Sequence, residues 1–274
     1  MGKRTVFFVS DQTGVTAETM GHSLLTQFDG AQYQSVTLPF IATQAQAAEV
    51  VQRVDAAGAE SGLRPIIFAT LVDDQVRTVL QQTNALLLDF FGAFLGPLEV
   101  ELAMPSAHAS GRAHGMADLA AYTARINATN FALANDDGSG ARDYDGADVV
   151  LVGVSRSGKT PTCLYLALQY GVYAANYPLV EEDLDSGELP PVLVPHRQKL
   201  FGLTIRADRL QQIRQERRPN SRYASPQQVQ FELRSALAMF ARTGMPFLDT
   251  TQCSIEEIAS RILDRQRLER RVRL

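Results

Sequence analysis

The feature that most restricts the fold is a glycine-flanked octapeptide between two apolar segments. The run Asp148–Val152 is typical of a buried strand, and it leads directly into Gly153-Val-Ser-Arg-Ser-Gly-Lys-Thr160. The residues from about Thr160 to Tyr170 favour a helix, and Gly171 is placed to end it. Because a strand that turns through a short loop into a helix is a building unit of α/β proteins, the sequence predicts an α/β fold.

The octapeptide matches the pattern GxxxxGK[ST] at every fixed position. Glycine lets the backbone fold tightly around an anion, and the amide groups at the start of the helix converge on that anion. The pattern therefore predicts a phosphate-binding loop in which Lys159 supplies positive charge and Thr160 offers a hydroxyl to Mg²⁺. A turn without a ligand is the alternative. The other positions expected to bind the nucleotide are Gly153, Val154, Ser155, Arg156, Ser157 and Gly158.

The alternation of apolar runs and helical segments extends along the whole chain. Before the octapeptide we expect strands at 5–9 and 65–69, an apolar stretch at 35–41, helices at 16–28, 44–57 and 116–134, and mostly helix over 73–98. After it we expect strands at 199–205 and 246–248, a surface loop over 181–191 and a last helix that begins at Ser254. The polar turn Asp136–Gly140 predicts a boundary between an N-terminal α/β lobe, 1–142, and a kinase-like phosphate-loop lobe, 143–274.

Composition argues against several classes of function. The formal net charge of −4 gives no general attraction to nucleic acid. Cys163 and Cys253 are the only cysteines and have no CxxC pattern nearby, so we expect neither a zinc site nor a disulfide framework. Since no apolar stretch resembles an export signal or a membrane span, we expect a cytoplasmic protein.

Two aspartates after the octapeptide are candidates for a catalytic role. Asp249 and Asp208 each follow an apolar run, so either carboxylate could bind Mg²⁺ through water beside the phosphates. Aspartate is also a preferred turn and helix-capping residue, so a turn role for Asp249 and a capping role for Asp208 are equally open. Asp136 and Asp137 could accept a hydroxyl proton, although adjacent acids before a glycine are first of all typical of a turn.

Three further features have both a functional and a plain structural interpretation. The segment Arg206–Arg222 is rich in arginine, which suits the spread charge of a transferring phosphoryl group but also suits a solvated helix face. Asp11 lies in the turn Ser10–Gly14 after a buried strand, where open α/β sheets often bind ligands. His114, beside Arg112, could contact a phosphate or could simply be exposed.

Several longer segments, in this order, resemble one protein family over nearly the whole chain. They are Ser10-Asp-Gln-Thr-Gly-Val-Thr-Ala-Glu18, Asn135-Asp-Asp-Gly138, the octapeptide with Pro161 and Thr162, Ala174-Ala-Asn-Tyr-Pro178, Lys199-Leu-Phe-Gly-Leu-Thr-Ile205 and Glu216-Arg-Arg218. The family comprises the bacterial phosphoenolpyruvate synthase regulatory proteins and their pyruvate, phosphate dikinase counterparts. Its pattern has histidine where this chain has Asn135, so we assign that position no catalytic role.

The resemblance implies a bifunctional enzyme. It would use ADP to phosphorylate a threonine of its target and would remove that phosphate with inorganic phosphate, releasing pyrophosphate. By matching motif, the nucleotide loop is Gly153–Thr160, with Lys159 and Thr160 as phosphate and Mg²⁺ contacts. Segments such as Thr37–Phe40 favour the synthase over the dikinase as target, and a homodimer is an open possibility.

Because ADP lacks a γ-phosphate, we hypothesise that its β-phosphate occupies the reacting position, covered by Arg156 or by the later arginines. Two other functions fit the phosphate loop. One is an ATP-dependent kinase of small molecules, and the other is a nucleotide sensor without catalysis. Product analysis distinguishes the three.

Overall fold

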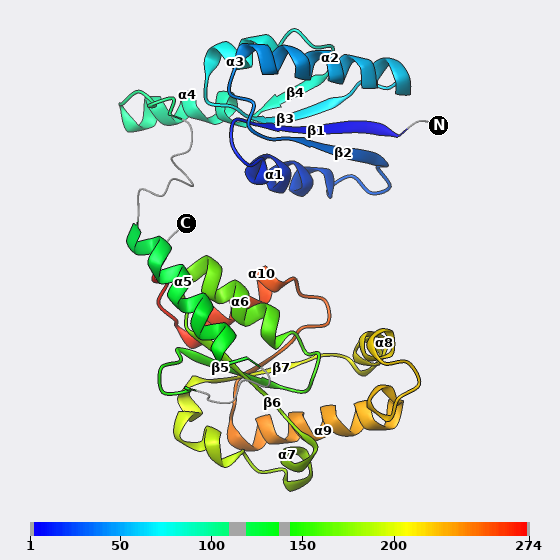
Figure 1. Ribbon diagram of the computed structural model, residues 1–274, viewed down its shortest axis with the longest axis vertical. Coiled ribbons are helices and arrows are strands. Elements are labelled where there is room, and N and C mark those ends of the chain that lie inside the picture. The colour runs from blue at the N-terminus through cyan, green and yellow to red at the C-terminus, as the bar shows by residue number, and fades with distance from the viewer. Residues whose placement is uncertain (1–2, 110–118, 137–142, 273–274) are drawn as a thin grey trace. The chain divides into compact units, whose positions relative to one another are not determined.

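The computed structural model describes residues 3–109, 119–136 and 143–272, and the chain divides into two compact units, Met1–Gly115 and Met116–Leu274 (Figure 1). Both units are mixed α/β, as expected. The elements of the first unit are β1 (Arg4–Ser10), α1 (Val15–Leu25), β2 (Tyr33–Leu38), α2 (Gln44–Ser61), β3 (Ile66–Thr70), α3 (Asp74–Leu80), β4 (Leu86–Asp89) and α4 (Phe90–Leu102).

The first unit is built on a parallel sheet of order β2-β1-β3-β4. Successive side chains of β1 point to opposite faces, and both faces are buried. Phe7 and Val9 pack against α2 and α3, whereas Val6 and Phe8 pack against α1 and the start of α4. A sheet covered by helices on both faces explains why the strands are continuous apolar runs.

The second unit contains a further parallel sheet, of order β6-β5-β7-β8. Its elements are α5 (Leu119–Ala134), β5 (Val149–Gly153), α6 (Lys159–Tyr170), β6 (Ala174–Pro178), α7 (Glu181–Ser186), the 3₁₀ helix η1 (Pro191–Lys199), β7 (Leu200–Thr204), α8 (Ala207–Arg217), the 3₁₀ helix η2 (Arg222–Ala224), α9 (Pro226–Thr243), β8 (Phe247–Asp249) and α10 (Ile255–Gln266).

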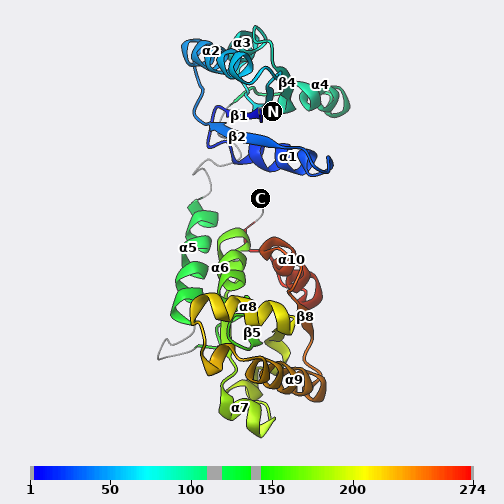
Figure 2. The same cartoon turned by 90° about the vertical axis from the view of Figure 1, so that its right-hand side faces the viewer.

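Helices cover both faces of this second sheet (Figures 1 and 2). Val149 and Leu151 of β5 face α5, α6 and α10, whereas Val150 and Val152 face α7, α8 and α9. The central strand β5 is therefore fully buried, and its carboxyl end carries the octapeptide. Since the four strands are parallel, the loops after β5, β6, β7 and β8 meet at the same edge of the sheet.

The structure differs from the sequence expectation in several places, among them strand β6 and helix α9, which were not expected. The stretch 73–98 contains a strand, β4, because the run of leucines at 86–88 pairs with β3 as an edge strand. The expected surface loop over 181–191 begins with the short helix α7. The second unit starts at Met116, so it includes α5, which the expected boundary at 142 assigns to the first lobe. Helix α5 packs on α6.

The two sheets have the same strand order, because in each the first strand lies between the second and the third and the fourth lies beyond the third. In each unit the first strand leads into a helix through a loop whose last residue is a glycine in the left-handed region, Gly14 (φ 86°) and Gly158 (φ 96°). Glycine accepts this conformation without steric cost. Within the described residues, no helix has the length and apolar character needed to cross a bilayer.

Replacement of Gly21 by alanine tests the packing of α1 on the first sheet. A Cβ at Gly21 would lie 2.5 Å from a ring carbon of Phe8 and 2.7 Å from one of Phe68. We expect Gly21→Ala to lower the free energy of unfolding by about 1–3 kcal/mol through overpacking. The control is Gly96→Ala in α4, where no atom lies within 4 Å of the added carbon, and this change should be neutral or stabilising by up to about 1 kcal/mol. Denaturant unfolding measures the free energy of unfolding of both variants. Equal values for the two would contradict the packing described.

Candidate phosphate site

The octapeptide forms the loop that joins β5 to α6. Glycine is required at its first position, because a Cβ on Gly153 would lie 2.5 Å from the Leu203 carbonyl oxygen of β7 and 2.8 Å from Ser157 Oγ. Arg156 has a left-handed backbone, with φ of 74°, so the loop makes a tight turn before Gly158 starts the helix. The absence of a side chain at Gly153 thus lets the loop and β7 approach closely.

The carbonyl groups of this loop are held by the protein around it. Gly153 O accepts from Leu179 N at 3.1 Å, Ser155 O from Arg214 at 3.1 Å, and Ser157 O from the Thr250 hydroxyl at 3.2 Å. In the described part of the chain, the amides of Ser155 and Arg156 have no hydrogen-bond partner. A loop whose carbonyls are bound and whose amides remain available is suited to an anion.

Lys159 brings a positive charge to the loop. Its side chain is only 3% exposed, and its Nζ donates to Val154 O at 3.0 Å, which holds the ammonium across the loop. Burial of a lysine is costly unless the ammonium is hydrogen-bonded and near compensating charge. This arrangement therefore fits a site in which the ammonium meets a phosphate.

Thr160 lies in a cluster of oxygen atoms at the start of α6. Its hydroxyl donates to Asp136 Oδ1 at 2.7 Å, and Asn176 Nδ2 of β6 donates to the same carboxylate. Within the part of the chain that the structure describes, Asn176 Oδ1 is buried without a hydrogen-bond partner, although its Nδ2 is bound. Buried polar atoms are normally satisfied, so this oxygen is an exception among the groups beside Thr160.

The oxygen cluster fits Mg²⁺, which prefers carboxylate, hydroxyl and amide oxygens and commonly takes one or two carboxylates together with substrate phosphates. Here Asp136 supplies one carboxylate and Thr160 the neighbouring hydroxyl, while Asn176 Nδ2 donates to both of these oxygens. Among the residues that the structure describes, no group of three or more His, Cys, Asp or Glu side chains is placed to hold a metal. A magnesium site here would therefore need phosphate oxygens as well.

A cavity of about 520 Å³ opens beside the loop. Its size is in the range of small-ligand sites. It is lined by Asp136, Ser155, Arg156, Gly158, Lys159, Thr160, Pro161, Ile213 and Arg217. Five of these belong to the eight positions expected from the motif, and α8 supplies Ile213 and Arg217 from outside it.

Asp249 ends β8 and Asp208 lies in the first turn of α8, and neither is among the residues that line this cavity. Asp249 accepts from Thr251 N at 2.9 Å and from the Thr251 hydroxyl, as a turn aspartate does. Asp208 is exposed and paired with Arg206, and hydrogen bonding from that guanidinium lowers the pKa of Asp208 to about 2. The contacts of Asp249 favour its turn interpretation, whereas Asp208 lies in the first turn of α8 and is not its N-cap, which is Arg206.

Position 135 has a structural role. Asn135 is buried, its Nδ2 donates to Phe131 O at 2.9 Å, and its Oδ1 accepts from Asp143 N at 2.6 Å. Both ends of the amide are thus used to join the end of α5 to the segment before β5. Asp137 and His114, which the sequence offers as a base and a phosphate contact, lie outside the described residues.

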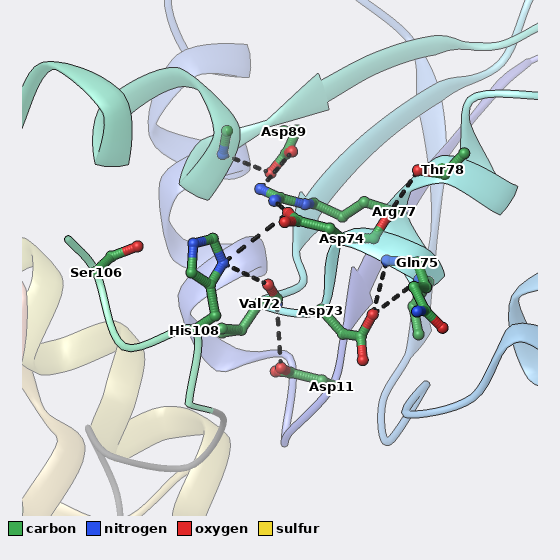
Figure 3. Close-up of polar contacts among 12 residues, drawn as sticks. Asp11, Val72, Asp73, Asp74, Gln75, Arg77, Thr78, Asp89, Ser106 and His108 are labelled. Atoms are coloured by element: carbon green, nitrogen blue, oxygen red, sulfur yellow. Dashed lines mark hydrogen bonds and ion pairs between the residues drawn. The ribbon is translucent and has the colours of Figure 1, made fainter. Parts of the chain in front are cut away.

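In the first unit, Asp11 belongs to a network of capping interactions at the ends of β1 and β3 (Figure 3). Its carboxylate accepts from Val72 N at 3.3 Å, and Asp73 caps α3 by accepting from Gln75 N at 2.7 Å. His108 Nδ1 lies 3.3 Å from Val72 O. The contacts drawn there hold loops of the unit together, in agreement with the turn interpretation of Ser10–Gly14.

The sequence does not indicate that Asn176 lies beside Thr160. It also does not distinguish Arg214 from the other arginines of the segment Arg206–Arg222. Asn176 stands within an apolar strand, and only its burial beside Thr160 and Asp136 reveals it. Arg214 is fully buried and bonds both Ser155 O and Glu232, at 3.1 and 2.6 Å. Arg214 lies four residues after Leu210, the other fully buried position of α8, and this helical spacing could have indicated that Arg214 is on the buried face.

A comparison with family models matches residues 6–263 to the kinase/pyrophosphorylase family. The chain belongs to that family. Membership assigns it a kinase-like phosphotransferase activity, which agrees with the phosphate-binding loop that the sequence predicts. The match spans both units, so the family is defined by the two together and not by the phosphate loop alone.

Curated relatives resemble the chain over almost its full length. A protein of Alkalilimnicola ehrlichii is 55% identical over 270 residues, which cover 98% of each chain. One of Alcanivorax borkumensis is 53% identical over 98% of this chain and 99% of its own. One of Legionella pneumophila (strain Corby) is 50% identical over 98% of this chain and 100% of its own. Each is designated a phosphoenolpyruvate synthase regulatory protein, and each designation is provisional.

Replacement of Arg214 tests the buried ion pair with Glu232 beside the loop. Arg214→Met leaves Glu232 as a nearly buried carboxylate without its cation, so we expect a loss of about 3–5 kcal/mol in unfolding free energy. The double variant Arg214→Met with Glu232→Leu removes the orphaned charge and should be more stable than the single variant. Arg261→Met, which breaks the exposed pair with Glu257, should cost no more than about 1 kcal/mol. A double variant no more stable than Arg214→Met would contradict this account.

The pairing of Asp208 with Arg206 predicts a specific pH dependence. Because the pKa of Asp208 is lowered from 3.8 to about 2, its ion pair is complete above pH 3.8 and is lost as the pH falls towards 2. In Arg206→Ala the pKa of Asp208 should return towards 3.8. Carboxyl chemical shifts followed by NMR measure both values, and an unchanged midpoint in the variant would show that Arg206 is not the cause.

Proposed function

We propose that this protein regulates phosphoenolpyruvate synthase by reversible phosphorylation of a threonine on that enzyme. The observation that carries the proposal is the loop after β5, where Lys159, Thr160 and backbone amides meet at a cavity beside Asp136. Family membership supports phosphoryl transfer, and the designations of the relatives support the choice of target. The protein would act in the cytoplasm, alone or as a homodimer.

In the inactivating direction the substrate is ADP. The target threonine hydroxyl attacks the β-phosphorus, the bond between that phosphorus and the bridging oxygen breaks, and AMP leaves with the bridging oxygen. Phosphothreonine forms and the hydroxyl proton is released. The loop would hold the diphosphate through its amides and Lys159, so that the β-phosphorus faces the hydroxyl in line with the leaving oxygen.

In the activating direction inorganic phosphate is the attacking group. One of its oxygens attacks the phosphorus of phosphothreonine, the bond to the threonine oxygen breaks, and pyrophosphate leaves while threonine regains a proton. The inorganic phosphate then takes the place that the α-phosphate of ADP occupies in the other direction. One site can therefore run both reactions when the acceptor changes.

The residues of the oxygen cluster have a positioning role in this proposal. Thr160 and Asp136 would hold Mg²⁺, which neutralises charge on the phosphate oxygens when bound, and Asn176 Nδ2 would orient the Asp136 carboxylate. Asp136 and Asn176 keep the Thr160 hydroxyl fixed at the start of α6. Arg156, at the tip of the loop, would cover the outer phosphate from the loop side. Ser157 and Gly158 shape the turn between them.

The experiment that tests the proposal is mass spectrometry of purified phosphoenolpyruvate synthase after incubation with this protein, Mg²⁺ and ADP. We expect one phosphothreonine on the synthase and an equal amount of AMP, and loss of that phosphate with release of pyrophosphate when inorganic phosphate is added. If pyruvate, phosphate dikinase were modified in a parallel incubation and the synthase were not, the dikinase would be the target in place of the synthase. A phosphorylated small molecule formed from ATP, or nucleotide bound but not consumed, would reject the proposal.

Lys159→Met should lower the rate in both directions by about 100-fold or more, because it removes the charge that stabilises the transferring phosphoryl group. Lys3→Met, an exposed change in the first unit, is the control and should leave both rates unaltered. Since Lys159 is buried, the denaturation midpoint of the variant is measured in parallel. Full activity in a folded Lys159→Met protein would exclude the proposed role of the loop.

A further inference from the structure

Helix α8 forms a wall of the cavity that does not belong to the phosphate loop. Ile213 and Arg217 both line the cavity, and their spacing of four places them on the same face of α8. Among the described residues that line the cavity, the charged groups are three cations, Arg156, Lys159 and Arg217, and one carboxylate, Asp136. Two of the cations come from the loop, and Arg217 is the one that α8 supplies.

Most arginines of the segment 206–222 already have partners. Those with side-chain partners are Arg206 with Asp208, Arg209 with Gln212, Arg214 with Glu232 and Arg222 with Glu181. Within the described residues, the guanidinium groups of Arg217 and Arg218 have neither a hydrogen bond nor an ion pair. Only Arg217 of these two lines the cavity. It is therefore the arginine of this segment that is available to an anion at the site.

The position of Arg217 relative to the loop is fixed by Arg214, one turn earlier on the same helix. The fully buried guanidinium of Arg214 donates to Ser155 O, to Tyr223 O at 3.1 Å and to Glu232. It also lies 4.2 Å from the centre of the Tyr223 ring, whose hydroxyl is 2.9 Å from Ser155 Oγ. These contacts tie α8 to the loop backbone, so the wall that carries Arg217 is held against the phosphate site.

We propose that Arg217 is a catalytic residue that contacts the transferring phosphoryl group from the side opposite the loop. This inference rests on the proposed function. A planar guanidinium can bond two oxygens of that group and stabilise the charge that spreads over them in the transition state. The same phosphoryl group transfers in both directions, as the β-phosphate of ADP and as the phosphate of phosphothreonine. Arg217 therefore serves both reactions.

The test compares Arg217→Ala, Arg217→Lys and the neighbouring control Arg218→Ala, using full-length protein with synthase. We expect Arg217→Ala to lower kcat by about 100- to 1,000-fold in both directions while KM for ADP changes less than about 5-fold, because the interaction is made mainly in the transition state. Arg217→Lys should recover only part of the loss, since an ammonium lacks the planar fork. Arg218→Ala should retain the rates of the unaltered protein.

Calorimetric titration with ADP and Mg²⁺ separates this role from a general loss of structure. Arg217→Ala should bind ADP within about 5-fold of the unaltered protein, because the loop and Lys159 hold the diphosphate. A higher KM with unchanged kcat, or rates equal to those of Arg218→Ala, would overturn the inference for Arg217. If the unaltered protein transfers no phosphate from ADP, the proposed function fails instead, and the two failures are thus distinguishable.

Discussion

The candidate site of the second unit depends on hydrogen bonds that the neighbouring segments donate to the carbonyl groups of the loop after β5. Leu179, Arg214 and Thr250 come from three different segments, and each donates to a loop carbonyl. The close approach of Leu203 O to Gly153 completes this enclosure. With its carbonyls directed into the protein, the loop presents amides to the cavity, and an ammonium and a hydroxyl follow at the start of α6. Backbone hydrogen bonding of this kind prepares an anion site before any ligand arrives.

The two units share a strand order and the position of a glycine before the first helix, but they differ in chemistry at that point. After Gly158 the second unit has Lys159 and Thr160, whereas after Gly14 the first has Val15 and Thr16. In the first unit the loop carries Asp11, which accepts a hydrogen bond from Val72 N. The same topology thus supports a loop followed by a buried lysine in one unit and, in the other, a loop without a lysine. Fold alone does not assign the chemistry.

The sequence predicts the local parts of the site well, because the octapeptide specifies strand, turn and helix within a few residues. Ser254 begins α10 as its capping pattern indicates, and it accepts from Glu257 N. The sequence cannot predict contacts that join distant segments. Thr160 and Asp136 are 24 positions apart, and Asp136 by itself reads as a turn residue. Arg214 resembles its neighbours in composition, and only its burial against the loop distinguishes it. Strand β4 was missed because a leucine run also suits a helix.

The central claim is that the loop and Lys159 hold a diphosphate so that its outer phosphoryl group passes to a protein hydroxyl. It is tested most directly by following ADP labelled at either the α- or the β-phosphate during incubation with phosphoenolpyruvate synthase. The account predicts that β-label appears on a synthase threonine while α-label remains entirely in AMP. Transfer of α-label to the protein, or transfer from the γ-phosphate of ATP with none from ADP, would contradict it.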